Sequence, residues 1–443
     1  MTAENGSTPC NSYLTPNTLS RVCFINRCYW PDSEATGQLL TELCEFLAPR
    51  WEVSAIAGQP NWEIENESFV RSGVQTRNGV AIHRLLHSRL PKSQRFARVR
   101  NLVSFTLAVR RWGKTPGKDC IEPIYESSSA ERNSKTKGKC EIIVCETDPF
   151  LLPLVVGPMA RRRKARLIYY LQDIYPDVAV AVGVAKNNVP IRFLRNRLKA
   201  EYLRADCIVV LDEDMRHRLV DWGIPKKKLQ IVPNWMNCST VTPIKSNNPF
   251  RAEQHLDDNF VVMHSGNMGL TQRLDVLVDA MRLVTDHVSE RRITLALVGN
   301  GAKRHELEVQ CAGYDHVRFF DYQPRETLAA SLSAADLHIV SMDAAITGCL
   351  APSKLYGILA SGTPVLAIVP EGNAVWRLVE KERIGWNVVP GDRNAIAEAL
   401  RNSLRMERSE LKAMGERGRA LAERLYDKQI CCEAFEAILK STS

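Results

Sequence analysis

The sequence predicts an α/β protein of two domains, each built around a parallel sheet with helices on its faces. Three observations support this fold class. The chain has 443 residues, too many for one ordinary core and enough for two domains of roughly 200 residues each. Short apolar segments typical of buried strands alternate with segments of helical periodicity, and the alternation starts again after a polar stretch in mid-chain. Glycine-containing loops follow several strands, as in doubly wound sheets.

The first domain is predicted to span residues 20–237. A strand at 21–26, a loop containing Gly37, a helix over 38–47 and a strand at 52–57 form a β–loop–α–β opening. Later strands are predicted at 141–145, 165–170, 207–211 and 230–232, and the clearest helix at 191–205. Two polar segments fall outside this pattern: we expect a disordered tail over 1–19 and a mobile insertion over 113–139.

The second domain is predicted to span residues 238–425. Its strands are expected at 260–264, 294–298, 317–320, 337–340, 364–368 and 385–389. A helix is expected to start near Leu274, and several helical pieces follow the last strand. The final segment, 426–443, is predicted to form a C-terminal helix that packs back on the first domain.

Charge is distributed unevenly along the chain. Residues up to Thr240 contain 35 Lys and Arg against 24 Asp and Glu, whereas the remainder contains 24 against 26. A basic first half predicts an anionic partner, such as a membrane surface, a phosphorylated acceptor or nucleic acid. The alternative is a solvated basic face without a partner. Nucleic acid is disfavoured because the basic stretches lack aromatic residues at the spacing of a known module.

Cysteines and apolar runs bear on the compartment. The 13 cysteines show neither zinc-ligand nor CxxC spacing, which favours a reducing compartment. The N-terminus lacks the pattern of a signal peptide, and the longest apolar run, 150–160, is too short to cross a bilayer. We therefore expect a cytoplasmic protein, with peripheral attachment to the inner face of the plasma membrane as an option.

Two glycine loops are candidates for phosphate binding. Gly266, Asn267 and Gly269 follow a strand and precede a helix, and Gly299 and Gly301 follow the next strand. Glycines permit positive φ and close backbone approach, and helix N-termini attract phosphate. Ordinary tight turns are the alternative. Arg273, at the end of the first loop, is the cation expected to reach a pyrophosphate.

The segment 347–365 is the strongest functional marker. Pro352 and Ser353 suit a helix start, with the Ser353 hydroxyl available to an anion. Lys354 stands in the first helical turn, where a cation opposes the helix dipole. A phosphate ligand would explain this lysine better than helix stability does. A helix that only packs on the sheet is the alternative.

These residues resemble a known family. The sequences at 352–356 (PSKLY) and 360–365 (ASGTPV) are similar to the donor-site signature of retaining GT-B glycosyltransferases. The resemblance is to the family 4-like, bacterial polysaccharide branch with WbuB-like and colanic-acid-type enzymes. It covers residues 21 to about 425. Supporting matches lie at 29–32, 171–176, 232–237, 265–269, 298–301 and 334–336.

The resemblance implies a GT-B fold, in which two Rossmann-like domains face each other across a cleft. The acceptor would lie mainly on the first domain and the nucleotide sugar on the second. Gly37 would approach the donor phosphates, Tyr322 and Gln323 would lie against the base, and Asp173 would stand at the cleft as a catalytic residue. Gln172 occupies a position where relatives often have histidine, and it can bind a sugar hydroxyl without titrating.

Two departures from the family pattern concern the donor site. Relatives carry two glutamates eight positions apart, and the second reads the ribose; here Cys349 and Gly357 occupy those positions. The phosphate lysine expected near position 272 is also absent, which leaves Gln272 and Arg273. We expect Arg273 and Lys354 to supply the two cations instead.

The predicted function is transfer of a hexosyl group from a UDP- or GDP-sugar to a lipid-linked or saccharide acceptor in cell-surface polysaccharide synthesis. Arg273, Lys354 and backbone N–H groups would stabilise the leaving diphosphate, so we expect no metal and no cofactor. Retention through front-face attack is implied by the resemblance. Two alternatives stay open: a catalytically degenerate scaffold in an assembly complex, and a nucleotide-sugar 2-epimerase.

Overall fold

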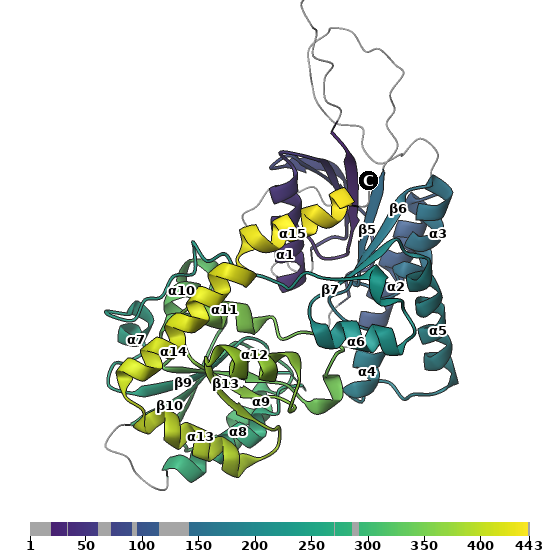
Figure 1. The fold of residues 1–443 in the computed structure, drawn as a ribbon. Helices are drawn as coiled ribbons and strands as arrows, with labels where there is room; N and C mark the ends of the chain where they lie inside the picture. Colours follow the sequence, from purple (N-terminus) through teal and green to yellow (C-terminus); the bar gives the residue numbers. More distant parts are fainter. Residues whose placement is uncertain are drawn as a thin grey trace, which may run out of the picture.

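A computed structural model describes residues 19–32, 34–60, 72–90, 95–114, 141–269, 271–285 and 292–441. These residues form two α/β domains that lie next to each other, with the C-terminal helices crossing from the second domain to the first (Figure 1). Most of the predicted tail and of the predicted insertion, residues 1–18 and 115–139, lies outside the described residues. The fold class is confirmed.

The N-terminal domain has an eight-stranded sheet of order β3-β4-β2-β1-β5-β6-β7-β8. All neighbours pair in parallel except β3 with β4, which form a hairpin. The strands are β1 (Arg21–Ile25), β2 (Glu52–Ala57), β3 (Gly73–Arg77), β4 (Val80–Arg84), β5 (Ile142–Glu146), β6 (Arg166–Tyr170), β7 (Cys207–Val210) and β8 (Leu229–Ile231).

The β3–β4 hairpin is absent from the sequence-based prediction. Its turn is Asn78-Gly79, and both residues have positive φ, 46° and 80°. A two-residue turn with this geometry matches the twist of the flanking strands, and Asn-Gly is its usual sequence. The signal was therefore present, but β3 has no buried residue, and β4 alternates buried with half-buried side chains.

Helices cover both faces of this sheet. They are α1 (Ala35–Leu47), α2 (Arg95–Trp112), α3 (Pro153–Arg163), α4 (Asp177–Ala181), α5 (Val189–Arg204) and α6 (Glu213–Asp221). The basic stretch that contains α2 was not predicted as a helix, because Arg residues interrupt its apolar periodicity. Phe105, Val109 and Trp112 on one side of α2 are buried in the domain core.

The C-terminal domain has a six-stranded parallel sheet of order β11-β10-β9-β12-β13-β14. Its strands are β9 (Phe260–Ser265), β10 (Ile293–Val298), β11 (Val317–Phe320), β12 (Leu337–Ser341), β13 (Val365–Ile368) and β14 (Gly385–Val388). Its helices are α7 (Pro249–Glu253), α8 (Leu274–Thr285), α9 (Arg304–Gln310), α10 (Arg325–Ser333), α11 (Lys354–Ala360), α12 (Ala374–Glu382), α13 (Arg393–Arg405) and α14 (Arg408–Leu421). Each predicted strand of this domain is present.

The last helix, α15 (Lys428–Ser441), lies on the N-terminal domain next to α1 (Figure 1). Its Phe435 ring is 5.1 Å from the Tyr170 ring and 6.2 Å from the Phe24 ring. Cys431 and Leu439 are also part of that domain's core. Burial of these side chains holds the end of the chain on the first domain. It stabilises this contact by about 25 cal/mol for each Å² of apolar surface removed from water.

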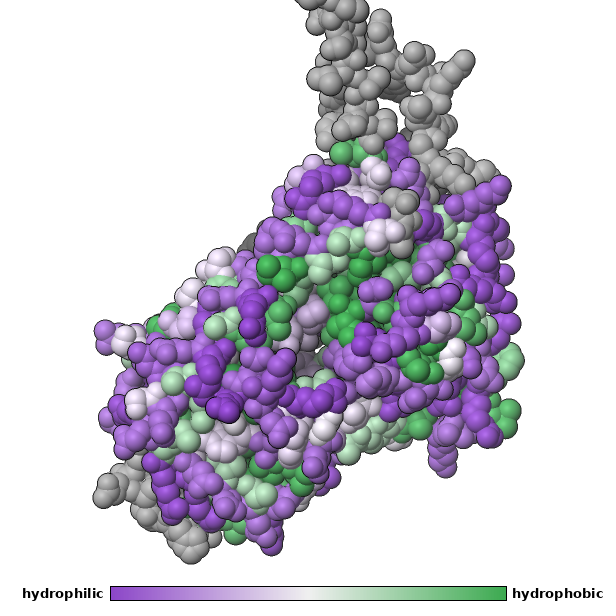
Figure 2. All heavy atoms as spheres, in the orientation of Figure 1, coloured by the Kyte–Doolittle hydropathy of each residue, from purple (hydrophilic) through white to green (hydrophobic). Residues whose placement is uncertain are grey.

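Polar and apolar side chains are unevenly spread over the face in Figure 2. Polar residues dominate the C-terminal domain, apolar residues gather on the N-terminal domain, and the surface is hollowed where the two domains meet. Among the described residues, no helix is both long and apolar enough to span a membrane.

Candidate functional site

Two segments that the sequence singled out meet where the domains face each other. Asp173 pairs with Leu350 in an isolated antiparallel bridge. The N–H of Ile174 donates to the carbonyl of Cys349 at 2.7 Å. The loop after β6 and the loop before α11 are therefore joined by backbone hydrogen bonds.

Lys354 is the first residue of α11, as predicted, and it is half-buried. Burial lowers the pKa of its ammonium group from 10.5 to about 7. The Nζ atom lies 3.1 Å from Nε2 of His264, at the end of β9. No carboxylate of the described residues lies within ion-pairing distance of Lys354. A partly desolvated cation without a counter-ion marks a place for an anionic ligand.

His264 is a residue that the sequence-based reasoning missed as functional. Its side chain is fully buried, and burial followed by the charge of Lys354 lowers its pKa well below 6.5. A neutral imidazole can accept a hydrogen bond from the Lys354 ammonium group. The available signal was a histidine near the carboxyl end of an otherwise apolar strand, directly before a glycine loop.

The glycine loops after β9 and β10 pack closely on each other. A Cβ atom on Gly299 would lie 2.2 Å from the carbonyl oxygen of Gly266, and one on Gly301 would lie 2.4 Å from that of Met268. Both positions have positive φ, 125° and 154°. Gly299 and Gly301 are therefore required for contact between loops. Gly266 (φ 124°) is different, since a Cβ there would lie 3.8 Å from Cε of Lys354.

The remaining predicted donor residues occupy the same edge of the sheet but differ in their contacts. Gly269 donates its N–H to Oε1 of Gln272, and Asn267 is exposed beside it. Tyr322 is 59% exposed, and partial burial of its hydroxyl raises its pKa against the opposite effect of the Asn300 backbone. Gln323 donates to the carbonyl of Asp321.

Arg273 and Ser353 make few contacts. Arg273 has φ 44°, is exposed, and pairs with Asp275 at 3.3 Å. Among the described contacts, Lys354 touches His264 beside the Gly266 loop, whereas the Arg273 side chain touches Asp275, so a role of Arg273 at a phosphate stays a prediction. Ser353 precedes α11 as predicted and is exposed, with no side-chain capping bond.

Gly37 lies in the first turn of α1 and is buried. A Cβ atom there would lie 3.2 Å from the backbone of Cys28 and of Tyr29. Close packing of α1 against the loop after β1 therefore explains why position 37 is a glycine.

Cys349 and Gly357 stand where the resemblance implies glutamates. Cys349 is buried at the domain contact, and burial raises the pKa of its thiol to about 11. A Cβ on Gly357 would lie 3.1 Å from Cε of Met236 and 3.2 Å from Cδ1 of Leu332. Apolar side chains thus occupy the space beside Gly357 that a longer residue would need.

A pocket of about 190 Å³ lies at the carboxyl ends of the N-terminal strands. It is lined by Asn26, Arg27, Glu34, Thr36, Leu102, Glu146, Thr147, Asp148, Phe150, Gln172, Asp173 and Tyr175. Ligands of doubly wound sheets bind at this edge. The predicted residues Gln172 and Asp173 are thus brought together here, and Glu146, the last residue of β5, was not predicted.

Asp173 and Gln172 are held differently. Burial, followed by the charge of Asp148, raises the pKa of the Asp173 carboxyl to about 6. Gln172 accepts a hydrogen bond at Oε1 from Asn234 at 3.0 Å and donates its backbone N–H to Oγ1 of Thr147. Asp173 is therefore the group placed to exchange a proton near neutral pH, and Gln172 is fixed in orientation.

At the border of this pocket, one group of described side chains has the spacing of a metal site: Cys28 with the lining residues Glu34 and Asp148. Burial and the charge of Asp148 raise the pKa of Cys28 well above 9. The protonated thiol lies 2.9 Å from Asp148 and 3.2 Å from Glu34, and Arg27 pairs with Asp148. Hydrogen bonds and one ion pair therefore explain why these three side chains lie together.

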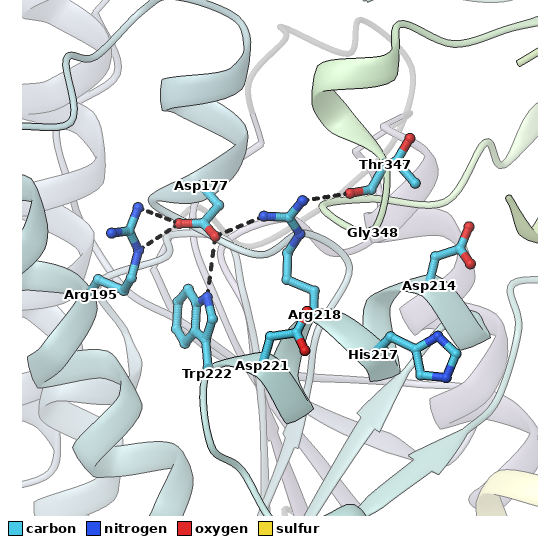
Figure 3. A pocket seen from close by; sticks show the side chains of 9 residues that line it. All are labelled: Asp177, Arg195, Asp214, His217, Arg218, Asp221, Trp222, Thr347 and Gly348. Carbon is cyan, nitrogen blue, oxygen red and sulfur yellow. Dashed lines mark hydrogen bonds and ion pairs between the residues drawn. The ribbon is translucent and has the colours of Figure 1, made fainter. Parts of the chain in front are cut away.

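A second pocket, of about 500 Å³, lies between α4, α5, α6 and the loop at Thr347 (Figure 3). At its centre Asp177 accepts hydrogen bonds from Arg195 (2.7 Å), Arg218 (3.1 Å) and Trp222 (3.2 Å). Arg218 also donates to the carbonyl of Thr347 at 2.8 Å. We call this chain, Asp177–Arg218–Thr347, the interdomain latch, since it joins the N-terminal helices to the loop that leads to Lys354.

Comparisons with known protein families cover both domains. The family described as "Glycosyl transferase 4-like domain" matches residues 35–235, and "Glycosyl transferases group 1" matches residues 259–406. The chain is 27% identical over 308 residues to the probable glycosyltransferase WbjE of Pseudomonas aeruginosa, covering 68% of this chain and 74% of the other. It is 23% identical to the putative colanic acid biosynthesis glycosyl transferase WcaI of Escherichia coli K12, covering 92% and 96%.

Solved structures agree on the architecture. Sucrose-phosphate synthase of Thermosynechococcus elongatus has a TM-score of 0.71 at 18% identity, covering 95% of this chain and 98% of that one. HepE of Anabaena, solved in complex with UDP-glucose, has a TM-score of 0.64 at 14% identity, covering 95% and 99%. At these identities the likeness concerns the fold.

Proposed function

Because the chain belongs to the GT-B glycosyltransferases, we propose that it transfers a hexosyl group from a nucleotide-diphosphate sugar to a saccharide or lipid-linked acceptor in bacterial polysaccharide synthesis. The observation that carries this proposal is Lys354, a cation without a counter-ion among the described residues, on the edge of the second domain. Its loop is bonded to the loop of Asp173 on the first domain. A donor diphosphate at Lys354 would thus stand opposite a carboxyl group that can exchange a proton.

Donor binding would place the diphosphate between Lys354 and the glycine loop at Gly266, with Tyr322 beside the base. We favour UDP, which is supported by the UDP-glucose complex of the similarly folded HepE. Negative charge that develops on the leaving diphosphate would be stabilised by the Lys354 ammonium group rather than by a metal ion. Cys349 and Gly357 offer no carboxylate to the ribose.

Transfer with retention is proposed from the likeness of the motifs at 352–356 and 360–365 to retaining enzymes. In a front-face mechanism Asp173 would orient the acceptor hydroxyl and Gln172 would bind a sugar hydroxyl. The 2-epimerase alternative needs an acid and a base beside the donor sugar. Asp173 and Lys354, with pKa values of about 6 and about 7, could fill these two roles, so the identity of the product has to separate transfer from epimerisation. A scaffold would bind nucleotide without turnover.

Thermal shift against UDP, GDP and ADP, followed by a panel of the matching sugar nucleotides in buffer with EDTA, tests the proposal. A shift with UDP and release of UDP from one sugar nucleotide are expected. Proton NMR of the product would give its anomeric configuration. Binding without turnover on any donor, with or without acceptor, would favour the scaffold.

The first domain is proposed to rest on an anionic membrane, where a lipid-linked acceptor would be reached. Val99, Val103 and Leu107 on α2 follow each other at four-residue spacing and are 59%, 39% and 41% exposed. Arg100 and Arg110 flank them and are exposed. An apolar stripe bordered by cations is typical of a helix that lies in the membrane interface.

Flotation with phosphatidylglycerol vesicles is expected to carry the protein upward, and the double variant V103D/L107D is expected to lose most of this binding. Val309 is a matched control position, because it is 64% exposed on α9 of the other domain. V309D is expected to float like the wild type. Equal flotation of wild type and V103D/L107D would refute membrane attachment through α2.

The interdomain latch is expected to matter for turnover more than for donor affinity. Arg218→Met removes the bond to Thr347, while Asp177 keeps Arg195 and Trp222. We expect kcat to fall about tenfold, the effect of losing one charge-assisted hydrogen bond, with UDP affinity within twofold. Arg216→Met on the same helix, which removes a pair with Glu213, is the control. Equal kcat in both variants would contradict the latch.

A further inference from the structure

Glu146 carries a buried carboxyl group in the N-terminal pocket, and the cost of burying this group is poorly offset by hydrogen bonds. It is the last residue of β5 and is only 2% exposed. Neither of its carboxyl oxygens has a partner at good hydrogen-bond geometry among the described residues, although the Gln172 side chain lies near enough for a longer, weaker hydrogen bond. Burial, and then the charge of Asp148, raises its pKa well above 4.5, although the hydrogen bond from the Gln172 side chain acts in the opposite direction. A buried carboxyl group in this condition destabilises the fold, so a different benefit is expected from it.

Two further atoms of the same pocket lack a hydrogen-bond partner at good geometry in the part of the chain that the structure describes. They are Nε2 of Gln172, which is a donor, and Oδ1 of Asn26, which is an acceptor. Both residues line the pocket and are at most 6% exposed. Together with Glu146 they offer donors and acceptors within one small space. Hydroxyl groups both donate and accept, so a group rich in hydroxyls can satisfy all of these atoms.

The charge of the pocket opposes a phosphate. Its lining contains the carboxyl groups of Glu34, Glu146, Asp148 and Asp173. The one guanidinium among the described lining residues, that of Arg27, pairs with Asp148 at 2.9 Å. A phosphate at this place would share the pocket with the carboxyl groups of Glu34, Asp148 and Asp173, and the guanidinium beside it is already paired, so phosphate binding is disfavoured electrostatically.

One wall of the pocket is aromatic. The rings of Phe150 and Tyr175 are stacked, with centroids 4.6 Å apart and planes inclined by 9°. Leu102 of α2 adds an aliphatic side chain to the lining. Apolar walls with a few convergent polar atoms are the usual form of a site for a small organic ring.

We propose that this pocket binds the hydroxyl groups of an uncharged sugar ring, the accepting end of the acceptor, in preference to a phosphorylated one, and that Glu146 is one of the groups that bond these hydroxyls. This rests on the proposed function, because the pocket borders Asp173 and through it the donor loop. Any lipid diphosphate of the acceptor would then lie outside the pocket, and only its sugar would enter.

Saturation-transfer NMR with UDP present tests the proposal with simple probes: methyl glycosides of glucose, galactose and mannose, and the 6-phosphates of the same hexoses. Wild-type protein is expected to bind at least one neutral glycoside and to bind the corresponding phosphate at least tenfold more weakly. Glu146→Leu is expected to weaken neutral-glycoside binding about tenfold, the effect of one lost hydrogen bond. Glu146→Gln, which keeps a donor and an acceptor, is expected to retain most of it.

The melting temperature separates this role from a structural one. Replacing an unpartnered buried carboxyl group with an apolar side chain is expected to leave Glu146→Leu as stable as wild type or more stable. Glu141→Gln, exposed just before the same strand, is the control. A lower melting temperature for Glu146→Leu, no binding of any neutral glycoside by wild type, or equal binding of the phosphates would overturn the proposal. Absence of UDP binding and of turnover would instead refute the proposed function.

Discussion

Asp173→Asn is expected to lower kcat by about 10²- to 10⁴-fold, the usual contribution of a positioned acid–base group, while UDP affinity stays within twofold. Asp173 lines the N-terminal pocket, and its backbone pairs with Leu350 of the donor loop. It is thus the carboxyl group that borders both proposed substrate sites. With a pKa of about 6, it is mostly ionised at pH 7.5 and able to accept a hydrogen bond or a proton from the acceptor hydroxyl.

The pH profile and the stability of this variant follow from the same raised pKa. In wild type, kcat is expected to fall as pH drops below about 6. A folded-state pKa above the unfolded value of 3.8 means that the contribution of Asp173 to stability is present below pH 3.8 and is lost as pH rises through 6. The asparagine side chain of the variant does not titrate, so Asp173→Asn is expected to be at least as stable as wild type at pH 7.5.

Steady-state kinetics, UDP titration and thermal melts check this prediction. Asp257→Asn, at an exposed position of the second domain, is the matched control and is expected to behave like wild type. If Asp173→Asn kept more than a tenth of wild-type kcat, Asp173 would have no proton-transfer role. A loss of kcat accompanied by a lower melting temperature would assign it to the structure of the loop.

Much of the fold could be predicted from the sequence because its buried parallel strands are nearly continuous apolar runs. Each strand predicted for the second domain is present, with bounds that differ by one residue at most. The elements that were not predicted are those with weaker burial. In the β3–β4 hairpin, β3 has no buried residue, and α2 exposes Val99, Val103 and Leu107 while burying Phe105. A helix that is apolar on two sides does not show simple periodicity.

The candidate site likewise contains residues that the sequence predicted and residues that it did not. Lys354 and Asp173 stand in recognisable motifs, and the structure joins their loops. Glu146 and His264 lie at the ends of apolar strands, where a single polar residue in the sequence gives no indication of its partners. Their properties depend on contacts distant in sequence: Gln172 for Glu146, and Lys354 for His264.

Cys349 and Gly357 occupy the positions where the resemblance implies glutamates, and the structure shows contacts of both that the sequence alone does not. Gly357 faces Met236, whose backbone bonds to Tyr426 and Lys428 at the start of α15. Cys349 offers its carbonyl to Ile174. Both positions thus serve contacts between the domains. Position 357 therefore offers no carboxylate to a ribose, and under the proposed function we expect the diphosphate to provide more of the donor affinity.

Lys354→Met is accordingly expected to weaken UDP binding about 10- to 100-fold, the range for losing a charge-assisted hydrogen bond to a ligand, and to abolish measurable transfer. Methionine keeps most of the length of the side chain and needs no counter-ion, so the melting temperature without nucleotide is expected to hold or rise. Lys381→Met, 81% exposed on α12, controls for loss of a positive charge from the same domain.

Proton linkage gives a second, independent measurement of the same residue. The lowered pKa of about 7 means that stability rises with pH between 7 and 10.5, where the unfolded chain still holds the proton that native Lys354 has lost. A bound diphosphate favours the ammonium form, so UDP binding at pH 8 is expected to take up a proton, and affinity is expected to fall as pH rises above 7. Calorimetry at pH 8 in two buffers of different ionisation enthalpy measures this uptake. Lys354→Met should bind without it, since neutral His264 cannot provide the charge. Proton uptake that persists in the variant would show that another group faces the phosphates, and the donor site would then have to be assigned to other residues.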